Sequence, residues 1–222
     1  MSELGERLGR RFARFATRAV VARPGLWRLF RGPLRTLFDR LAPVWEGRRG
    51  PEALASLEAA LERLPDAPRR VLDLGTGTGK AARLVARRFP EAEVVGVDLS
   101  PAMIAQARRL LPPEFAPRVS FEVADAAALR FDGGAFDLVV LLNMIPFFGE
   151  LARVTGPGGW VVLASSSGPG TPIYVPPETA RARLAALGFD TFEEVAAGES
   201  TALLAGRRGA GYDGAQATSA AR

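Results

Sequence analysis

From Val71 onward, short runs of β-branched and apolar residues alternate with segments whose apolar residues recur at helical spacing. Runs of the first kind predict strands, and segments of the second kind predict helices. Because strands that alternate with helices form parallel sheets covered on both faces, the pattern predicts a doubly wound α/β fold. The predicted strands are 71–75, 94–98, 119–124, 137–142 and 159–165, with helices at 79–89, 101–111 and 147–154.

The C-terminal part of the chain has a different pattern. A helix is predicted over 177–187, and two apolar runs follow at 192–196 and 201–205, separated by a turn at Gly198. Since so short a connection joins antiparallel strands, we expect the mostly parallel sheet to end in an antiparallel hairpin. The last segment, 207–222, is rich in Gly, Ala and Ser, which predicts a disordered tail.

The first 45 residues carry apolar side chains at helical spacing, with arginines between them. This pattern predicts two or more amphipathic helices, punctuated by Pro24, Pro33 and Pro43. A further helix is predicted over 51–64. We therefore expect a helical arm or lid at 1–50 and a ligand-binding domain at 51–206.

The positive charge of the chain is concentrated in this arm. The net charge is +5, yet residues 1–50 contain 12 arginines and 4 acidic residues, a balance of +8. Three interpretations are open: a lid with solvated arginines, an arm that binds an anionic membrane through residues 1–45, or a nucleic-acid contact. The regular apolar face disfavours nucleic acid. No apolar run is long enough to span a bilayer, so we expect a cytoplasmic protein, with membrane association as a further interpretation.

The sequence contains no cysteine and no histidine. The first absence excludes disulfides and thiolate chemistry, and the second removes the commonest general base and the commonest metal ligand. We therefore expect no metal site. Any proton transfer falls to Asp, Glu, Tyr or the substrate itself.

The strongest chemical signal is the junction Val71-Leu-Asp-Leu-Gly-Thr-Gly-Thr-Gly-Lys80, a strand that runs into a glycine-rich turn and then a helix. Alternate glycines allow a sharp turn close to a ligand, and the helix offers free N–H groups. Two acids accompany the turn: Asp73 within the first strand and Asp98 at the end of the second. These features predict a nucleotide-like ligand. A nicotinamide or flavin dinucleotide is the alternative, although Asp73 would repel a pyrophosphate.

An ordered set of motifs resembles the class I S-adenosylmethionine-dependent methyltransferases over residues 71–206. The set comprises the glycine-rich turn, Val94-Val-Gly-Val-Asp98, Val123-Ala-Asp-Ala126, Phe136-Asp-Leu-Val-Val140 and Pro157-Gly-Gly-Trp-Val-Val-Leu163. The resemblance implies a Rossmann-like fold with a seven-stranded sheet. It also implies S-adenosylmethionine as the cofactor and S-adenosylhomocysteine as its product.

The resemblance further implies a role for individual residues in binding the cofactor. Asp73 would lie near the ammonium group, Asp98 would accept hydrogen bonds from the ribose hydroxyls, and Asp125 would accept one from the adenine amine. Leu99 and Ala126 would pack on the adenine ring. For Asp125, capping of a turn or helix is the alternative. The turn around the methionine part would comprise Gly75, Thr76, Gly77 and Gly79.

Two other segments are candidates for the cofactor and acceptor site. Asn143-Met-Ile-Pro-Phe-Phe148 is similar to the Asn-Pro-Pro-Tyr/Phe box of DNA and protein amide methyltransferases, but two residues intervene before its single proline. Asn143 and Tyr174 are therefore candidates for the catalytic pocket, Asn143 also for cofactor binding. Phe38-Asp-Arg-Leu-Ala-Pro-Val-Trp-Glu46 is similar to an element that folds over the cofactor in small-molecule and quinone methyltransferases. Trp45 is expected beside the sulfonium, with packing in the core as the alternative.

Methyl transfer is a direct displacement on an activated sulfonium, so alignment and exclusion of water are its main requirements. The resemblance implies an enzyme acting on a small-molecule or lipid-like acceptor. The alternatives are a cofactor-binding interaction module without transfer activity and an RNA or protein methyltransferase that uses the basic arm. The sequence leaves the oligomeric state open.

Overall fold

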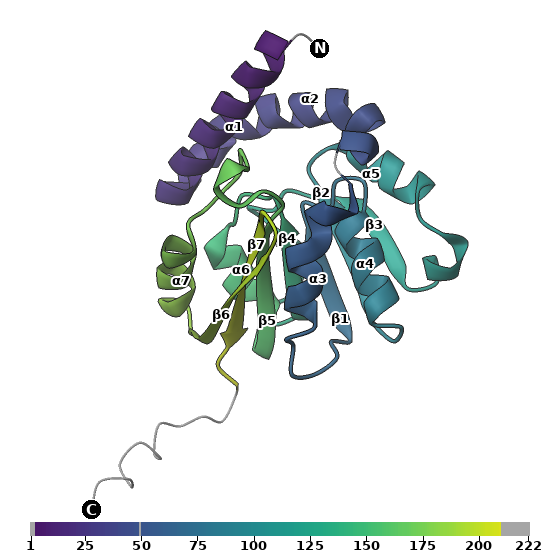
Figure 1. Ribbon diagram of the computed structural model, residues 1–222. Coiled ribbons are helices and arrows are strands. Elements are labelled where there is room, and N and C mark those ends of the chain that lie inside the picture. The colour runs from purple at the N-terminus through teal and green to yellow at the C-terminus, as the bar shows by residue number, and fades with distance from the viewer. Residues whose placement is uncertain (1–2, 49, 210–222) are drawn as a thin grey trace, which may run out of the picture.

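The computed structural model describes residues 3–48 and 50–209, and the greater part of the predicted tail lies outside them. Seven strands form one sheet in the order β3-β2-β1-β4-β5-β7-β6 (Figure 1). The doubly wound α/β prediction is confirmed. The strands are β1 (Arg70–Leu74), β2 (Glu93–Asp98), β3 (Val119–Val123), β4 (Phe136–Leu142), β5 (Thr155–Ser165), β6 (Phe189–Ala197) and β7 (Ser200–Arg207).

Strands β1 to β5 pair in parallel, while β7 pairs antiparallel with both β5 and β6. The two C-terminal strands thus form the predicted hairpin. Its strands are longer than the predicted runs because pairing with β5 continues to Gly206. The β1–β4 pairing marks the place where the strand order reverses, and ligands bind open α/β sheets beyond the carboxyl ends of the strands there.

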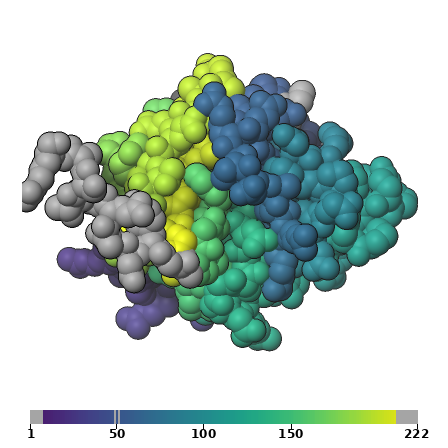
Figure 2. All heavy atoms as spheres, turned by 90° about the horizontal axis from the view of Figure 1, so that it is seen from below, coloured from purple at the N-terminus to yellow at the C-terminus, as the bar shows by residue number. Residues whose placement is uncertain are grey.

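Helices cover both faces of the sheet, and each face has its own apolar core. Figure 2 views the molecule from the end opposite the arm and shows α3 (Ala55–Leu61) beside the C-terminal hairpin. The helix predicted over 51–64 is shorter in the structure. Its first turn is the 3₁₀ segment η3 (Pro51–Leu54), and the α-helix ends at Leu61. The other helices of the domain are α4 (Lys80–Arg88), α5 (Pro101–Arg109), α6 (Phe148–Val154) and α7 (Pro177–Ala185), with short 3₁₀ turns at η4 (Pro113–Phe115) and η5 (Gly168–Gly170).

The N-terminal arm lies across the carboxyl ends of the strands (Figure 1). It consists of α1 (Glu3–Ala22), η1 (Pro24–Leu26), α2 (Trp27–Trp45) and η2 (Glu46–Arg48). Its inner residues Ala16, Val20, Trp27 and Leu34 belong to the same buried cluster as residues of β1, β2 and β4. The arm is therefore packed on the domain as a roof over the sheet edge.

The prediction that Pro33 and Pro43 punctuate the arm is wrong, because α2 continues through both. A proline inside a helix removes one backbone hydrogen bond and strains the preceding turn. Here the helix is held by burial of Leu34, Leu41 and Ala42 against the domain, and tertiary packing of one apolar face is the main source of helix stability. Pro24 does interrupt the arm, at η1.

Candidate active site

A cavity of about 1000 Å³ lies at the carboxyl ends of the strands beneath the arm. The glycine-rich turn and the ends of β2 and β4 form its floor, and the apolar side of α2 forms its roof. Of the residues predicted to bind the cofactor, this cavity is lined by Trp45, Asp73, Gly75, Thr76, Gly77, Asp98, Leu99, Ala126 and Asn143.

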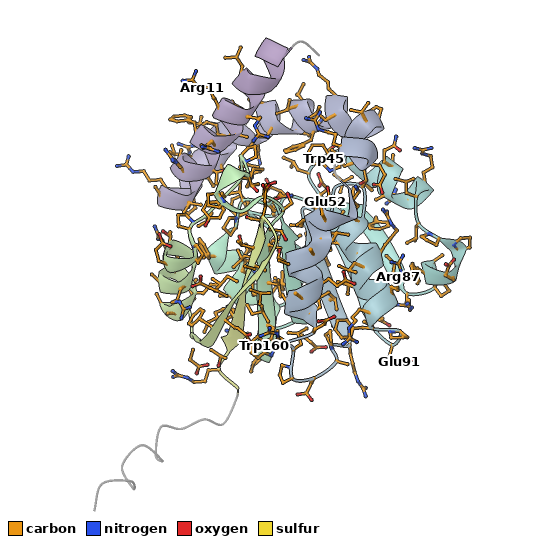
Figure 3. The ribbon with its side chains drawn as sticks, in the orientation of Figure 1. Arg11, Trp45, Glu52, Arg87, Glu91 and Trp160 are labelled. Carbon is orange, nitrogen blue, oxygen red and sulfur yellow. The ribbon has the colours of Figure 1, made fainter. Side chains whose placement is uncertain are left out.

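The three glycines of the turn all have positive φ values, 75° at Gly75, 55° at Gly77 and 82° at Gly79. L-residues with side chains rarely adopt this conformation, so the alternating glycines are required by the backbone. A Cβ on Gly77 would lie 3.2 Å from Nε1 of Trp45, because the tryptophan reaches from the end of α2 to the turn. Figure 3 shows Trp45 between α2 and the carboxyl ends of the strands.

Gly79 differs from its two neighbours because it does not line the cavity. A Cβ at this position would lie 2.8 Å from the ring of Phe121 in β3, so Gly79 allows α4 to begin close to the sheet. Its observed role is in packing and in the start of α4. The expected contact with the methionine part is not supported by this placement.

The Asp73 side chain is buried beneath the turn. Its Oδ2 accepts hydrogen bonds from Thr76 Oγ1 at 2.5 Å and from the backbone N–H of Ala82 at 2.9 Å. Within the described part of the chain, Oδ1 receives no hydrogen bond. Burial raises the pKa of Asp73 to about 6, against the lowering effect of these two donors. A cationic ligand group beside Asp73 would therefore stabilise the ionised carboxylate and offset the cost of burying its charge.

Asp98, at the end of β2, shapes the turn with both of its carboxylate oxygens. Oδ2 accepts the N–H of Gly77 at 2.9 Å, and Oδ1 accepts the N–H of Ser100 at 2.8 Å. Burial raises the pKa of Asp98, while the two backbone donors oppose this shift. Each carboxylate oxygen has a second lone pair, so the group can still accept hydrogen bonds from two hydroxyls of a ligand in the cavity.

Asp125 follows β3 and contacts the arm. Its Oδ1 accepts a hydrogen bond from Trp27 Nε1 at 2.7 Å and one from the N–H of Ala127 at 3.0 Å, and Oδ2 lies 3.5 Å from Arg31. Its neighbours Ala124 and Ala126 line the cavity, but Asp125 does not. The hydrogen bond from Ala127 agrees with the turn-capping alternative. Trp27 donates to the same carboxylate that is expected to accept a hydrogen bond from adenine.

The end of the arm is fastened to the glycine-rich turn through Glu46. Its carboxylate accepts a hydrogen bond from Thr78 Oγ1 at 2.6 Å and forms an ion pair with Arg83 at 2.8 Å. A second attachment joins Asp39 to Ser100 Oγ at 2.6 Å, at the start of α5. The sequence places Asp39 and Glu46 in the element expected to fold over the cofactor, but it does not predict these contacts. Their partners lie 32 to 61 residues away, and no local pattern specifies the pairing.

Asn143 directly follows β4 and lies in the left-handed region with φ 55°, and no other described residue with a side chain has a positive φ. Its Oδ1 accepts hydrogen bonds from the backbone N–H and the hydroxyl of Ser166, at 3.0 and 3.1 Å. Because a backbone N–H can only donate, this contact fixes which side-chain atom is the oxygen. Within the described residues the Nδ2 group has no acceptor, so it remains a donor for a ligand in the cavity.

Tyr174 is placed apart from these residues. It lines a second cavity, of about 280 Å³, and not the large one. Burial and the carboxylates of Glu178 and Glu194 raise the pKa of Tyr174, which keeps the phenol protonated at neutral pH. The expected catalytic role is therefore not supported by this placement.

The described residues contain no group of three or more His, Cys, Asp or Glu side chains that could bind a metal ion. Nor does any helix within residues 3–48 and 50–209 have the length and apolar character needed to cross a bilayer.

Comparison with known proteins places this architecture in a family. Residues 71–159 match the family model described as a methyltransferase domain. The chain is 44% identical to the demethylmenaquinone methyltransferase of Thermus thermophilus over 115 residues, 49% of this chain and 50% of the relative. It is 40% identical to a trans-aconitate 2-methyltransferase of Methylobacterium nodulans over 111 residues, 46% of this chain and 41% of the relative. The chain thus spans about half the length of these curated relatives, or less.

A solved structure has the same fold. The S-adenosylmethionine-dependent methyltransferase of Aquifex aeolicus matches with a TM-score of 0.62 at 17% identity, covering 75% of this chain and 98% of that one. This likeness shows the fold, and the ordered motifs and the family model identify residues 71–159 as a class I S-adenosylmethionine-dependent methyltransferase domain.

Proposed function

We propose that this protein binds S-adenosylmethionine in the large cavity and transfers its methyl group to a small-molecule or lipid-like acceptor. One observation carries the proposal: the glycine-rich turn and the carboxylates Asp73 and Asp98 line a single cavity at the sheet edge. A dinucleotide is disfavoured because buried Asp73 would repel a pyrophosphate at this turn.

The residues of the cavity fit the chemical groups of this cofactor. Asp73 accepts the ammonium group through Oδ1, and Asp98 accepts the ribose hydroxyls through its remaining lone pairs. Leu99 and Ala126 provide apolar contacts for the base. Asp125 accepts a hydrogen bond from the adenine amine once its hydrogen bond from Trp27 Nε1 is broken. The positive φ values at Gly75 and Gly77 keep the floor of the cavity free of side chains.

The bound cofactor supplies a methyl group on a sulfonium, and the acceptor's lone pair forms the new bond while the electrons of the broken bond stay on sulfur. The chain contributes alignment and a dry site. Trp45 closes the cavity above Gly77, where its ring can face a cation. Asn143 orients the acceptor by donating a hydrogen bond from Nδ2.

The acceptor is inferred to be small and at least partly apolar. The roof of the cavity presents aliphatic and aromatic side chains, Leu34, Leu37, Phe38 and Leu41. The named relatives act on small molecules, one on a demethylmenaquinone and one on trans-aconitate. The apolar roof favours the first of these kinds of acceptor, while Arg10, Arg48 and Lys80 also line the cavity and could contact a polar head group.

The outer side of the arm supports a peripheral membrane location for a cytoplasmic protein. Nine arginines between residues 8 and 40 are exposed, whereas the single acid in this stretch, Asp39, is half-buried and faces Ser100. Three large apolar side chains, Leu8, Phe15 and Leu29, are about 60% exposed among these arginines. Apolar groups interspersed with arginines suit an anionic lipid surface. Figure 3 shows Arg11 pointing away from the sheet.

Calorimetry with S-adenosylhomocysteine tests the first half of the proposal, and we expect saturable binding with one site per chain. Incubation with methyl-labelled cofactor and a set of quinols, phenols and carboxylic acids, and in parallel with RNA and with protein, tests the second half. Binding without label transfer to any acceptor would favour an interaction module. Label recovered in RNA or protein would favour the macromolecular alternative, and absence of binding would overturn the proposal.

A further inference from the structure

The second cavity lies between the sheet and the segment 165–177 that leads from β5 into α7. Its volume of about 280 Å³ is close to the lower end of the roughly 300–1,000 Å³ typical of ligand pockets. Most of its wall is aliphatic, and the larger contributors are Leu141, Leu163, Ile173, Val175 and Leu203.

The charge of this wall restricts what the cavity can hold. Among the residues that the structure describes, neither lysine nor arginine lines it, and its one carboxylate, Glu194, is exposed at the rim with Ala196. The inner part, at Ala180 of α7 and Leu203 of β7, is buried and apolar. Such a wall gains from burying aliphatic groups, and although Ser165, Tyr174 and Thr201 bring hydroxyls to it, it offers no cationic partner to an anionic group.

The two cavities meet at two side chains, since Met144 and Ile173 line both. Met144 also lies against the glycine-rich turn, because a Cβ on Gly75 would be 2.7 Å from its sulfur. One flexible side chain therefore separates the cofactor turn from the second cavity. An unbranched thioether can change rotamer and fit different neighbours at low cost.

We propose that the second cavity binds the aliphatic chain of the methyl acceptor, while the reacting group lies beside Asn143 in the large cavity. This inference rests on the proposed function and narrows its substrate class. The acceptor is an amphiphile with a small polar or aromatic head and an apolar chain that passes Met144 and Ile173. A compact polyanion is excluded from this class because it would leave the second cavity unused.

The test compares two probes, 4-methylphenol and 4-heptylphenol, by calorimetry on the full chain saturated with S-adenosylhomocysteine. We expect the heptyl compound to bind at least about tenfold more tightly. Complete burial of its additional methylene groups would increase the affinity by more than this factor. Ala180→Leu fills the inner end of the cavity, and Ala196→Leu narrows its exposed rim without altering buried packing. Ala182→Leu is the matched control, since Ala182 is exposed on α7 and does not line the cavity.

Both cavity variants should remove most of the chain-length preference and leave the affinities for 4-methylphenol and S-adenosylhomocysteine unchanged, whereas Ala182→Leu should retain the preference. Equal affinities of the two phenols for the wild type would overturn the inference. So would a preference that survives Ala196→Leu in a folded protein, because the chain would then lie elsewhere. S-adenosylhomocysteine binding is measured first. Absence of that binding would contradict the proposed function, and this outcome is distinct from a failure of the chain-binding inference.

Discussion

Trp27 at the start of α2 donates a hydrogen bond from Nε1 to Oδ1 of Asp125, over 2.7 Å and 98 positions of sequence. The indole is 7% exposed and stacks edge-on against Phe147, with ring centroids 5.1 Å apart. The arm is thus joined to the carboxylate that the family resemblance assigns to adenine. Under the proposed function, attachment of the arm and recognition of the base would depend on one acceptor group.

Trp27→Phe retains the aromatic contact with Phe147 and removes the hydrogen bond. We expect the free energy of unfolding to fall by about 1 kcal/mol, since the Asp125 side chain is 21% exposed and water replaces part of the bond. S-adenosylhomocysteine should bind about fivefold more tightly, because the donor no longer competes with adenine. Denaturant unfolding and calorimetry measure the two effects. Weaker cofactor binding by Trp27→Phe would contradict the shared-acceptor interpretation.

Asp98→Ala tests the ribose assignment. Loss of charge-assisted hydrogen bonds should weaken S-adenosylhomocysteine binding by about 1–3 kcal/mol in calorimetry. Because Asp98 also holds the N–H groups of Gly77 and Ser100, thermal unfolding must show that the variant is folded. Asp66→Ala, an exposed acid in the loop before β1, is the control and should not change the affinity. Unchanged affinity in Asp98→Ala would count against the assignment.

The raised pKa of Asp73 makes stability depend on pH in a defined direction. Its pKa in the folded protein is about 6, against an ordinary value of 3.8, so the folded state binds more protons than the unfolded state between these values. Ionised Asp73 therefore opposes folding above pH 6, and this cost disappears as the pH falls toward 4. The difference corresponds to roughly 3 kcal/mol.

Asp73→Asn isolates this contribution. Relative to the variant, the wild type should gain up to roughly 3 kcal/mol of unfolding free energy between pH 7 and pH 4. Urea titrations of both proteins at four pH values measure the change, and other titrating groups cancel in the comparison. A difference that does not vary with pH would show that Asp73 keeps an ordinary pKa.

The outer face of the arm is tested with vesicles that contain anionic lipid. We expect the wild type to sediment with them at low salt and Arg18→Gln/Arg28→Gln to bind about 30-fold less tightly, at about 1 kcal/mol per arginine. Arg87→Gln/Arg88→Gln removes the same charge from the C-terminal end of α4, which points away from the arm (Figure 3), and should have little effect. Equal losses in both double variants would indicate a general charge effect, and no sedimentation of the wild type would exclude the membrane proposal.

The strands could be predicted from sequence to within a few residues because local chemistry specifies them. Runs such as Val94–Val97 favour extended backbone and are buried on both faces, and alternation with helices specifies parallel pairing. The positive φ values in the glycine-rich turn follow from the same kind of local signal. The prediction of Asp73 and Asp98 at one cavity succeeded because carboxyl ends of neighbouring parallel strands meet at one sheet edge.

Features decided by distant contacts could not be predicted in this way. The continuity of α2 through Pro33 and Pro43 depends on distant packing: Leu34 joins a cluster with Leu72, and Leu41 and Ala42 pack with Met103 of α5. The partner of Asp125 is Trp27, a residue of the arm for which the sequence alone predicts no contact. Gly79 fits the family motif, yet its position is explained by Phe121, which lies 42 residues further along.

The contacts that hold the arm also constrain the order in which the chain can fold during synthesis. Arg10 donates to the carbonyl of Gly170 and Arg183 to that of Val21, so partners of the first helix are made some 160 residues after it. Until then, the arm leaves the ribosome with its apolar side uncovered, and such surfaces aggregate or engage chaperones. Since ribosomes add roughly 5–20 residues per second, this interval lasts on the order of ten seconds.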